Sequence, residues 1–216
     1  FRLLFINSIF GDMGSIAFFM AQGWLALLVT GSPFWVGAVV GCQGLGLLIF
    51  ATIGGVMADR FERRNLVIGG QIMEASIALG VGVLVLTDTV AVWSLMLMGF
   101  LHGVSGAIRI PARNALIYDL VGKEQLLKGT AANFLVYSVV GIIAPLITGP
   151  VLDSSMVWAY FFVGAVVFVG AVILSFLRYQ PEQQQESVIR ASPWHDLVQG
   201  LSYGFKTPAI RVLVVV

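Results

Sequence analysis

Charged side chains are scarce in this chain of 216 residues: they make up 11% of it, against 58% for hydrophobic residues. Soluble domains usually carry about 25% charged residues. The mean hydropathy is +0.95, which leaves too little polar surface to face water and indicates a membrane protein. The net charge is only +1, and the basic residues form short clusters rather than an extended patch, so nucleic acid is not an expected partner.

Cysteine and histidine are almost missing too. The single cysteine, Cys42, excludes an internal disulfide, and no spacing typical of metal ligands or of a phosphate-binding loop occurs, so no cofactor and no metal site are expected. Gly103-Val104-Ser105-Gly106 resembles the G-x-S-G motif of rhomboid intramembrane proteases. That chemistry needs a histidine in the sixth apolar stretch to activate the serine, and this stretch has none, which speaks against an enzyme.

Six apolar stretches are each long enough to cross a bilayer core of about 30 Å as a helix of roughly 20 residues. They are Leu3–Val29, Phe34–Ala58, Leu66–Leu86, Val90–Ile108, Ala131–Leu152 and Val157–Leu177. The predicted fold is therefore an all-α membrane protein with six transmembrane helices. Residues 109–130 are expected to form a longer amphipathic loop between the fourth and fifth spans.

Three regions follow from this pattern. Residues 1–178 form the predicted six-helix transmembrane domain. Residues 179–207 form a polar cytoplasmic linker in which WHDLVQGLSYGF is typical of an interfacial helix. Residues 208–216 are apolar and are interpreted as the start of a seventh, truncated transmembrane helix.

The basic residues predict the orientation of the spans. Arg2 precedes the first span, Arg60, Arg63 and Arg64 follow the second, Arg109, Arg113, Lys123 and Lys128 follow the fourth, and Arg178, Arg190, Lys206 and Arg211 follow the sixth. The three short turns on the opposite side carry no Lys or Arg. By the positive-inside rule, the N-terminus and the long loops are expected to be cytoplasmic.

The turn after the second span carries a recognisable motif. Residues 55–64 read GVMADRFERR and resemble G-x-x-x-D-R-x-G-R-R, the signature loop of major facilitator superfamily transporters. The matching residues are Gly55, Asp59, Arg60, Arg63 and Arg64, while Glu62 replaces the inner glycine. Residues 108–135 are similar to the corresponding loop of the drug and siderophore exporters, which include macrolide efflux and enterobactin export proteins.

This resemblance implies a fold and a function. The chain would be the N-terminal half of such a transporter, organised as two inverted three-helix repeats and expected to work with a C-terminal half of the same protein. It would sit in a bacterial-type inner membrane, in contact with lipid. It would export a small amphipathic molecule (a drug, a siderophore or a lipid-like compound) by alternating access, with H+ as the coupling ion. A non-transporting half-length module or scaffold is the alternative.

The resemblance also implies a conformational latch in the motif. Gly55 would let two helices pack closely, and Asp59 would contact the second half in the outward-facing state. Arg113 and Asp119 are candidates to join Asp59 and Arg60 in a cytoplasmic charge network. The alternative is that these charges are a topological anchor and solvated loop residues.

Three ionisable residues lie inside predicted spans: Asp12, Glu74 and His102. Such residues are costly in a bilayer and indicate function by default. The polar stripe of the first span recurs every three or four residues and comprises Ser8, Asp12, Ser15, Phe19 and Gln22. With His102 and Asn133, this stripe is expected to line the substrate cavity, whereas Glu74 is expected to be more peripheral. The alternative for each ionisable residue is a structural polar contact.

Two further exporter motifs are present only in part. In the fifth span, Pro145 and Gly149 are retained, and a proline there is expected to bend the helix. In the fourth span, the Arg of R-x-x-Q-G is absent and His102 replaces the Gln. This departure leaves the identity of the coupling ion open.

Overall fold

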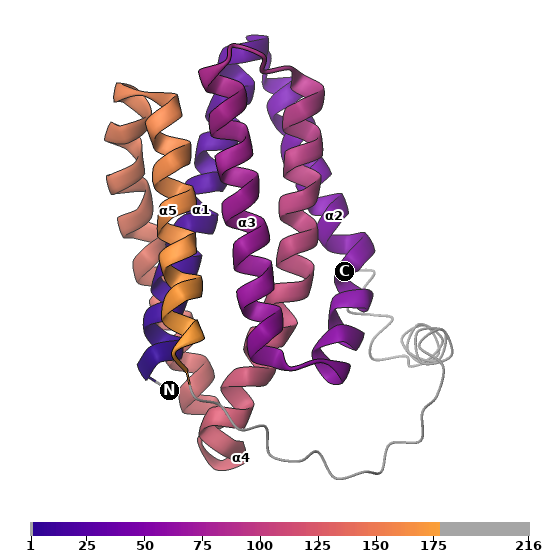
Figure 1. The fold of residues 1–216 in the computed structure, drawn as a ribbon, viewed down its shortest axis with the longest axis vertical. Coiled ribbons are helices and arrows are strands. Elements are labelled where there is room, and N and C mark those ends of the chain that lie inside the picture. Colours follow the sequence, from indigo (N-terminus) through magenta and orange to yellow (C-terminus); the bar gives the residue numbers. More distant parts are fainter. Residues whose placement is uncertain (1, 178–216) are drawn as a thin grey trace, which may run out of the picture. The chain divides into compact units, whose positions relative to one another are not determined.

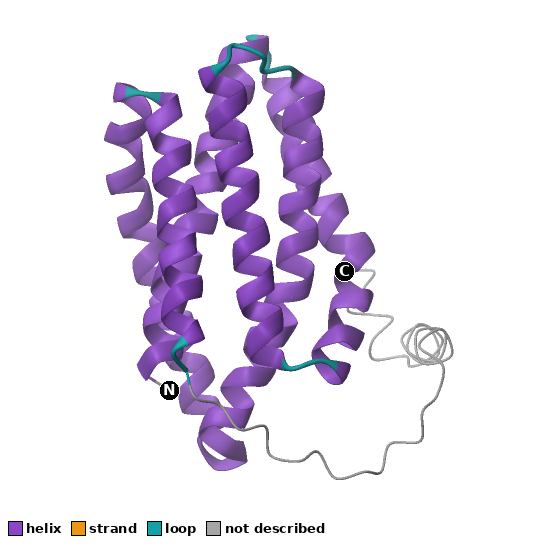
Figure 2. Ribbon diagram, in the orientation of Figure 1, coloured by secondary structure: helices purple, strands orange, loops and turns teal. Residues whose placement is uncertain are grey.

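In a computed structural model of the chain, residues 2–177 are described, and they are almost entirely helical (Figure 1, Figure 2). The helices are α1 (Arg2–Thr30), α2 (Pro33–Arg60), α3 (Arg63–Leu86), α4 (Val92–Ser154) and α5 (Met156–Ser175). All five are long and apolar enough to cross a membrane. The predicted linker at 179–207 and the predicted seventh helix at 208–216 lie outside the described residues.

The six predicted spans correspond to these five helices because α4 contains the fourth and the fifth. Its 63 residues reverse direction at Gly122, where φ is 70° and ψ is 171°. This left-handed conformation suits glycine, which has no Cβ to clash. Residues 92–121 are called the first arm of α4 here, and residues 123–154 the second arm. Figure 1 shows the two arms joined at the end of the bundle where α1 begins.

The prediction of a loop at residues 109–130 is wrong. The first arm continues as helix through Pro111 to Gly122, and the second arm starts directly after it. Propensity and charge suggested a loop, but burial of the arm against its neighbours favours the helix. Arg109 and Arg113 therefore lie within the helical bundle and are buried, at 6% and 8% exposure.

The helices pack closely where glycines remove side chains. A Cβ at Gly54 of α2 would lie 2.0 Å from the carbonyl oxygen of Ala107 in α4, and one at Gly103 of α4 would lie 2.0 Å from that of Gln43 in α2. Pro111 has no N–H, so it cannot donate to the Ala107 carbonyl four residues earlier. The backbone of α2 thus approaches α4 where that carbonyl is free of its helical donor.

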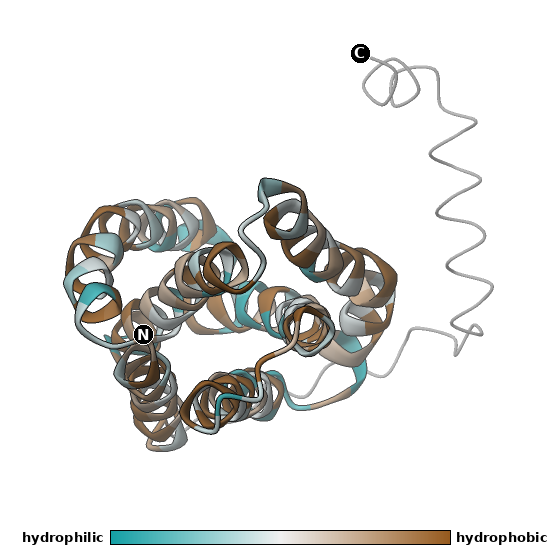
Figure 3. Ribbon diagram, turned by 90° about the horizontal axis from the view of Figure 1, so that it is seen from above, coloured by the Kyte–Doolittle hydropathy of each residue, from teal (hydrophilic) through white to brown (hydrophobic). Residues whose placement is uncertain are grey.

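Two apolar clusters of buried side chains lie along the bundle. The larger contains Phe18, Val81, Leu95 and Tyr160, and the smaller contains Leu4, Val67, Leu116 and Leu174. Each cluster draws on all five helices, with Val39 and Ala58 as the members from α2. Hydrophobic residues predominate on the helices seen from above (Figure 3), as expected of a surface facing lipid.

Candidate functional site

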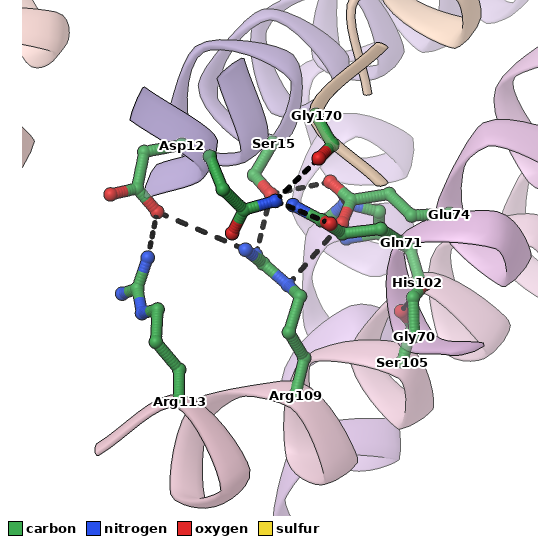
Figure 4. A network of polar contacts seen from close by, with 11 residues as sticks. Asp12, Ser15, Gly70, Gln71, Glu74, His102, Ser105, Arg109, Arg113 and Gly170 are labelled. Atoms are coloured by element: carbon green, nitrogen blue, oxygen red, sulfur yellow. Dashed lines mark hydrogen bonds and ion pairs between the residues drawn. The ribbon is translucent and has the colours of Figure 1, made fainter. Parts of the chain in front are cut away.

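Between the two apolar clusters, nine polar side chains form what is called the polar layer here. They come from three helices: Asn7, Asp12 and Ser15 of α1, Gln71 and Glu74 of α3, and His102, Ser105, Arg109 and Arg113 of α4. At 1.5 Å per residue, Asp12 and Glu74 lie about 15 Å along their helices, near half the thickness of a bilayer core of about 30 Å. Figure 4 shows most of these side chains pointing toward one another.

The two carboxylates of the layer are balanced by two guanidinium groups. Nη1 of Arg113 donates to Oδ1 of Asp12 at 2.6 Å. Arg109 lies between the carboxylates, with Nη1 at 3.9 Å from Asp12 and Nε at 3.5 Å from Oε2 of Glu74. Asp12 and Glu74 are only 2% and 1% exposed, so each carboxylate needs this compensation to remain charged.

Two further partners, Ser15 and His102, complete the surroundings of Glu74. The hydroxyl of Ser15 donates to Oε1 of Glu74 and accepts a hydrogen bond from Nη2 of Arg109 at 2.8 Å. Nε2 of His102 lies 3.2 Å from the same Oε1. The ring of Phe18 stacks on His102 with centroids 4.4 Å apart, which fixes the plane of the imidazole. An unbroken series of polar contacts thus runs from Arg113 to His102.

A second set of contacts ties the layer to the backbone. Nδ2 of Asn7 donates to Oε1 of Gln71 and to the carbonyl of Gly170 in α5, both at 2.8 Å. Ser105 donates to the carbonyl of Gly70 at 2.7 Å. Ser105 is therefore a bridge between α4 and α3 with no histidine at its hydroxyl, which is the opposite of an activated nucleophile.

Only some of the predicted cavity residues lie together in the polar layer. The structure brings Asp12, Ser15, Glu74 and His102 together, and Glu74 is central rather than peripheral. Gln22 is buried and donates to the carbonyl of Leu95 at 2.9 Å, so it ties α1 to α4.

The remaining predicted residues lie on the second arm of α4. Asn133 is half-buried there. Pro145 and Gly149 lie in unbroken helix, because the only non-helical backbone inside α4 is at Gly122. A flexing role for Pro145 stays a prediction.

The motif residues divide into two groups. Arg63 forms an ion pair with Asp119, and Arg64 donates to the carbonyls of Leu174 and Ser175 at the end of α5. Asp59 and Arg60 are exposed, and neither forms an ion pair within residues 2–177. Arg63 and Arg64 therefore hold this bundle together, whereas Asp59 and Arg60 face outward.

Two expectations about the motif are corrected. Arg113 does not join Asp59 and Arg60: it pairs with Asp12 inside the bundle, because the first arm of α4 carries it there. Apart from its own turn of α2, no described residue lies within 4 Å of a Cβ built on Gly55, and its neighbour Gly54 makes the close helix contact instead. Asp119 does contact the motif, through Arg63.

Sequence reasoning missed Arg109, Asn7, Gln71 and Ser105 as members of the site. The signal for Arg109 was present, since His102, Ser105, Arg109 and Arg113 follow one another at spacings of three and four residues, which is one face of a helix. Assigning residues 109–130 to a loop removed it from consideration. Asn7 and Gln71 are neutral amides, and their role depends on the position of Gly170, which the sequence does not give.

Comparisons with known proteins agree with this architecture. The profile of the major facilitator family described as transmembrane secretion effectors matches residues 1–216. Enterobactin exporters from Salmonella typhi and Salmonella typhimurium are 27% identical over 184 residues, and the one from Escherichia coli O1:K1 is 26% identical. These residues are 85% of this chain and 44% of each exporter, so the chain spans about half the length of the curated relatives it matches.

Proposed function

This chain belongs to the transmembrane secretion effector family of the major facilitator superfamily, and from that premise we propose that it is the N-terminal half of a proton-coupled exporter. The exported molecule is small and amphipathic: a drug, a siderophore or a lipid-like compound. The similarity to enterobactin exporters supports export as the direction. Transport proceeds by alternating access, with a C-terminal half of the same protein completing the cavity.

The observation that carries the proposal is the charge-balanced polar layer. Two carboxylates and two guanidinium groups are held near the middle of a membrane-spanning bundle, between apolar clusters. Placing charges there costs several kcal/mol unless they are paired. Adding one proton to a carboxylate therefore leaves one guanidinium without its counter-charge, and the helices have to rearrange or admit water.

Three groups in the layer are suited to take up that proton. Oδ2 of Asp12 and Nδ1 of His102 are buried and have no hydrogen-bond partner among residues 2–177, so a proton can bind there without breaking a bond within this part of the chain. Glu74 contacts both Arg109 and His102, so its protonation weakens links to α4. Because these groups join α1, α3 and α4, one protonation event acts on three helices.

The exposed residues of the motif, Asp59 and Arg60, supply the contact with the C-terminal half. Asp59 and Arg60 are exposed at the end of α2, next to arginines already engaged within the bundle. A helix end of the C-terminal half offers the partner for Asp59, and this contact holds the outward-facing state. The basic residues place this end of the bundle on the cytoplasmic side of a bacterial inner membrane.

Transport into inverted membrane vesicles tests the proposal. The full-length protein is expected to accumulate enterobactin or the macrolide erythromycin when a pH gradient is imposed, and to lose accumulation when the gradient is collapsed. Asp12→Asn and Glu74→Gln are expected to abolish gradient-driven accumulation. Asp88→Asn, in an exposed turn at the other end of α3, is the matched control.

Flux that is independent of the gradient in wild type would reject proton coupling. Retained gradient-driven accumulation in both carboxylate variants would reject the polar layer as its site. No flux of any tested drug or siderophore would favour a non-transporting membrane module.

A further inference from the structure

The polar layer is closed along the length of the bundle. On α1, Leu4 of the smaller cluster precedes it and Phe18 of the larger cluster follows it. On α3, Val67 and Val81 take the corresponding positions. A proton travelling along the helices would have to cross an apolar cluster from either side, so a route into the layer must come from the side of a helix.

Only one member of the layer is accessible from the side. Eight of the nine side chains belong to buried residues, with exposures from 0% to 8%. Ser15 is the exception and is half-buried. One turn further along the same face of α1, Phe19 is 48% exposed, whereas Gln22 beyond it is buried again, so the polar stripe of α1 is open at Ser15 and Phe19.

The bonding of Ser15 suits a proton relay. A serine hydroxyl has one donor and two acceptor positions. Its proton is committed to Oε1 of Glu74, and one acceptor position is occupied by Nη2 of Arg109. The second acceptor position remains for water on the accessible side. Arg109 cannot serve as a relay itself, because a guanidinium has no acceptor and does not release its proton in proteins.

We propose that the Ser15 hydroxyl is the proton entry to the polar layer and delivers protons to Glu74. A hydronium ion on the accessible side gives its proton to the free lone pair of the Ser15 oxygen and leaves as water, while the hydroxyl's own proton moves to Oε1 of Glu74. Ser15 ends as a neutral hydroxyl and Glu74 as a neutral acid. One proton has thus moved inward to Glu74, and Ser15 is restored to its starting form. This inference rests on the proposed function for its role in transport, and Ser15 acts through Glu74 as a positioning residue.

Other charged groups determine when this transfer is favourable. His102 and Arg109 of α4 contact Glu74 directly. Asp12 of α1 is linked to Glu74 through Arg109, and Arg113 of α4 pairs with Asp12. Helix α5 has no Asp, Glu, Lys, Arg or His, and α2 has charged residues only at its end, at Asp59 and Arg60. Arg109 opposes protonation of Glu74, so a proton arriving through Ser15 is retained when Arg109 turns toward Asp12.

A matched pair of variants isolates the hydroxyl. Ser15→Thr and Ser15→Val have nearly the same shape and differ in whether a hydroxyl is present. The purified complete protein is subjected to a rapid drop in pH, and the infrared C=O stretching band of the protonated carboxyl is followed in time. The part of this band that Glu74→Gln removes reports Glu74. Thermal melting of the two variants checks that they fold equally well.

Ser15→Val is expected to slow the appearance of the Glu74 band by about 100-fold, the lower end of the range for a positioned proton-transfer group. Ser15→Thr is expected to keep the wild-type rate. A wild-type rate in Ser15→Val, equal slowing in both variants, or a wild type without a Glu74 band would overturn the inference. Gradient-driven enterobactin flux tests the proposed function separately, since the infrared experiment needs no substrate and no membrane gradient.

Discussion

The first arm of α4 makes one kind of contact with α2 and another kind with α1 and α3. Toward α2, glycines bring the backbones together, and no side-chain hydrogen bond or ion pair joins α2 to α4 in the described residues. Toward α1 and α3, the contacts are charges and hydrogen bonds of the polar layer. The glycine contact depends on shape alone, whereas the polar layer depends on protonation. We therefore expect α2 and the first arm of α4 to move as one unit, and the contacts to α1 and α3 to respond to protons.

Substitutions that break an ion pair of the polar layer should have the largest effect on stability. Arg113→Met leaves Asp12 buried without its closest counter-charge, and removing one partner of a buried pair typically costs about 3 to 5 kcal/mol. Thermal melting of the purified protein in detergent measures the loss. Arg60→Met removes an exposed arginine with no ion pair in the described residues and should have little effect.

The double variant Asp12→Asn/Arg113→Met sharpens this result. It removes both charges, so it should recover most of the stability lost in Arg113→Met, as double-mutant cycles show for coupled neighbours. A double variant no more stable than Arg113→Met would mean that the arginine acts through packing rather than through charge.

Disrupting the glycine contact between α2 and α4 should have a somewhat smaller effect on stability. In Gly54→Ala the new methyl group meets the carbonyl oxygen of Ala107 at 2.0 Å, so the two helices must separate, at a cost of about 1 to 3 kcal/mol. The adjacent variant Gly55→Ala is a close control, because no described residue outside its own turn of α2 lies within 4 Å of its methyl position. Equal melting temperatures for the two variants would contradict the packing described for α2 and α4.

The smallest effect is expected outside the glycine contacts and the polar layer, at the pair of Arg63 and Asp119. Their side chains are each 16% exposed. Partly exposed pairs contribute about 1 kcal/mol or less, and salt screens them. Arg63→Gln should lower the melting temperature slightly at low salt and less at high salt. A loss independent of salt would mean that its bonds to the carbonyls of Ala58 and Ala115 matter more than the ion pair.

Much of the fold could be predicted from the sequence because the bilayer imposes a simple rule. Every backbone polar group needs an internal partner, so apolar stretches of about 20 residues become helices, and none of the six predicted spans extends more than about two residues beyond a helix of the structure. The boundary after the fourth span was wrong because charge was read as solvent exposure. Arg109 and Arg113 follow an apolar run, and only tertiary packing shows that they meet Asp12 and Glu74 inside the bundle.

The candidate site could be predicted in part for the same reason. An ionisable residue inside an apolar span is visible in any sequence, which is how Asp12, Glu74 and His102 were found. Their partners were not, since Asp12 and Arg113 are 101 residues apart and no local pattern links them. Likewise, the choice between Gly54 and Gly55 as the packing glycine depends on the rotation of α2 against α4, which helical periodicity leaves open because α2 is apolar on nearly every face.

The separation between Asp12 and Arg113 also matters for how the protein is made. A ribosome adds about 5 to 20 residues per second, so the carboxylate of Asp12 enters the membrane about 5 to 20 s before its guanidinium partner has been synthesised. Glu74 likewise precedes Arg109. During that interval the nascent α1 and α3 carry acids with no cation to balance them. An unpaired charge is costly in a bilayer, so the insertion of the first arm of α4, which brings Arg109 and Arg113, removes a cost that α1 and α3 carry until then.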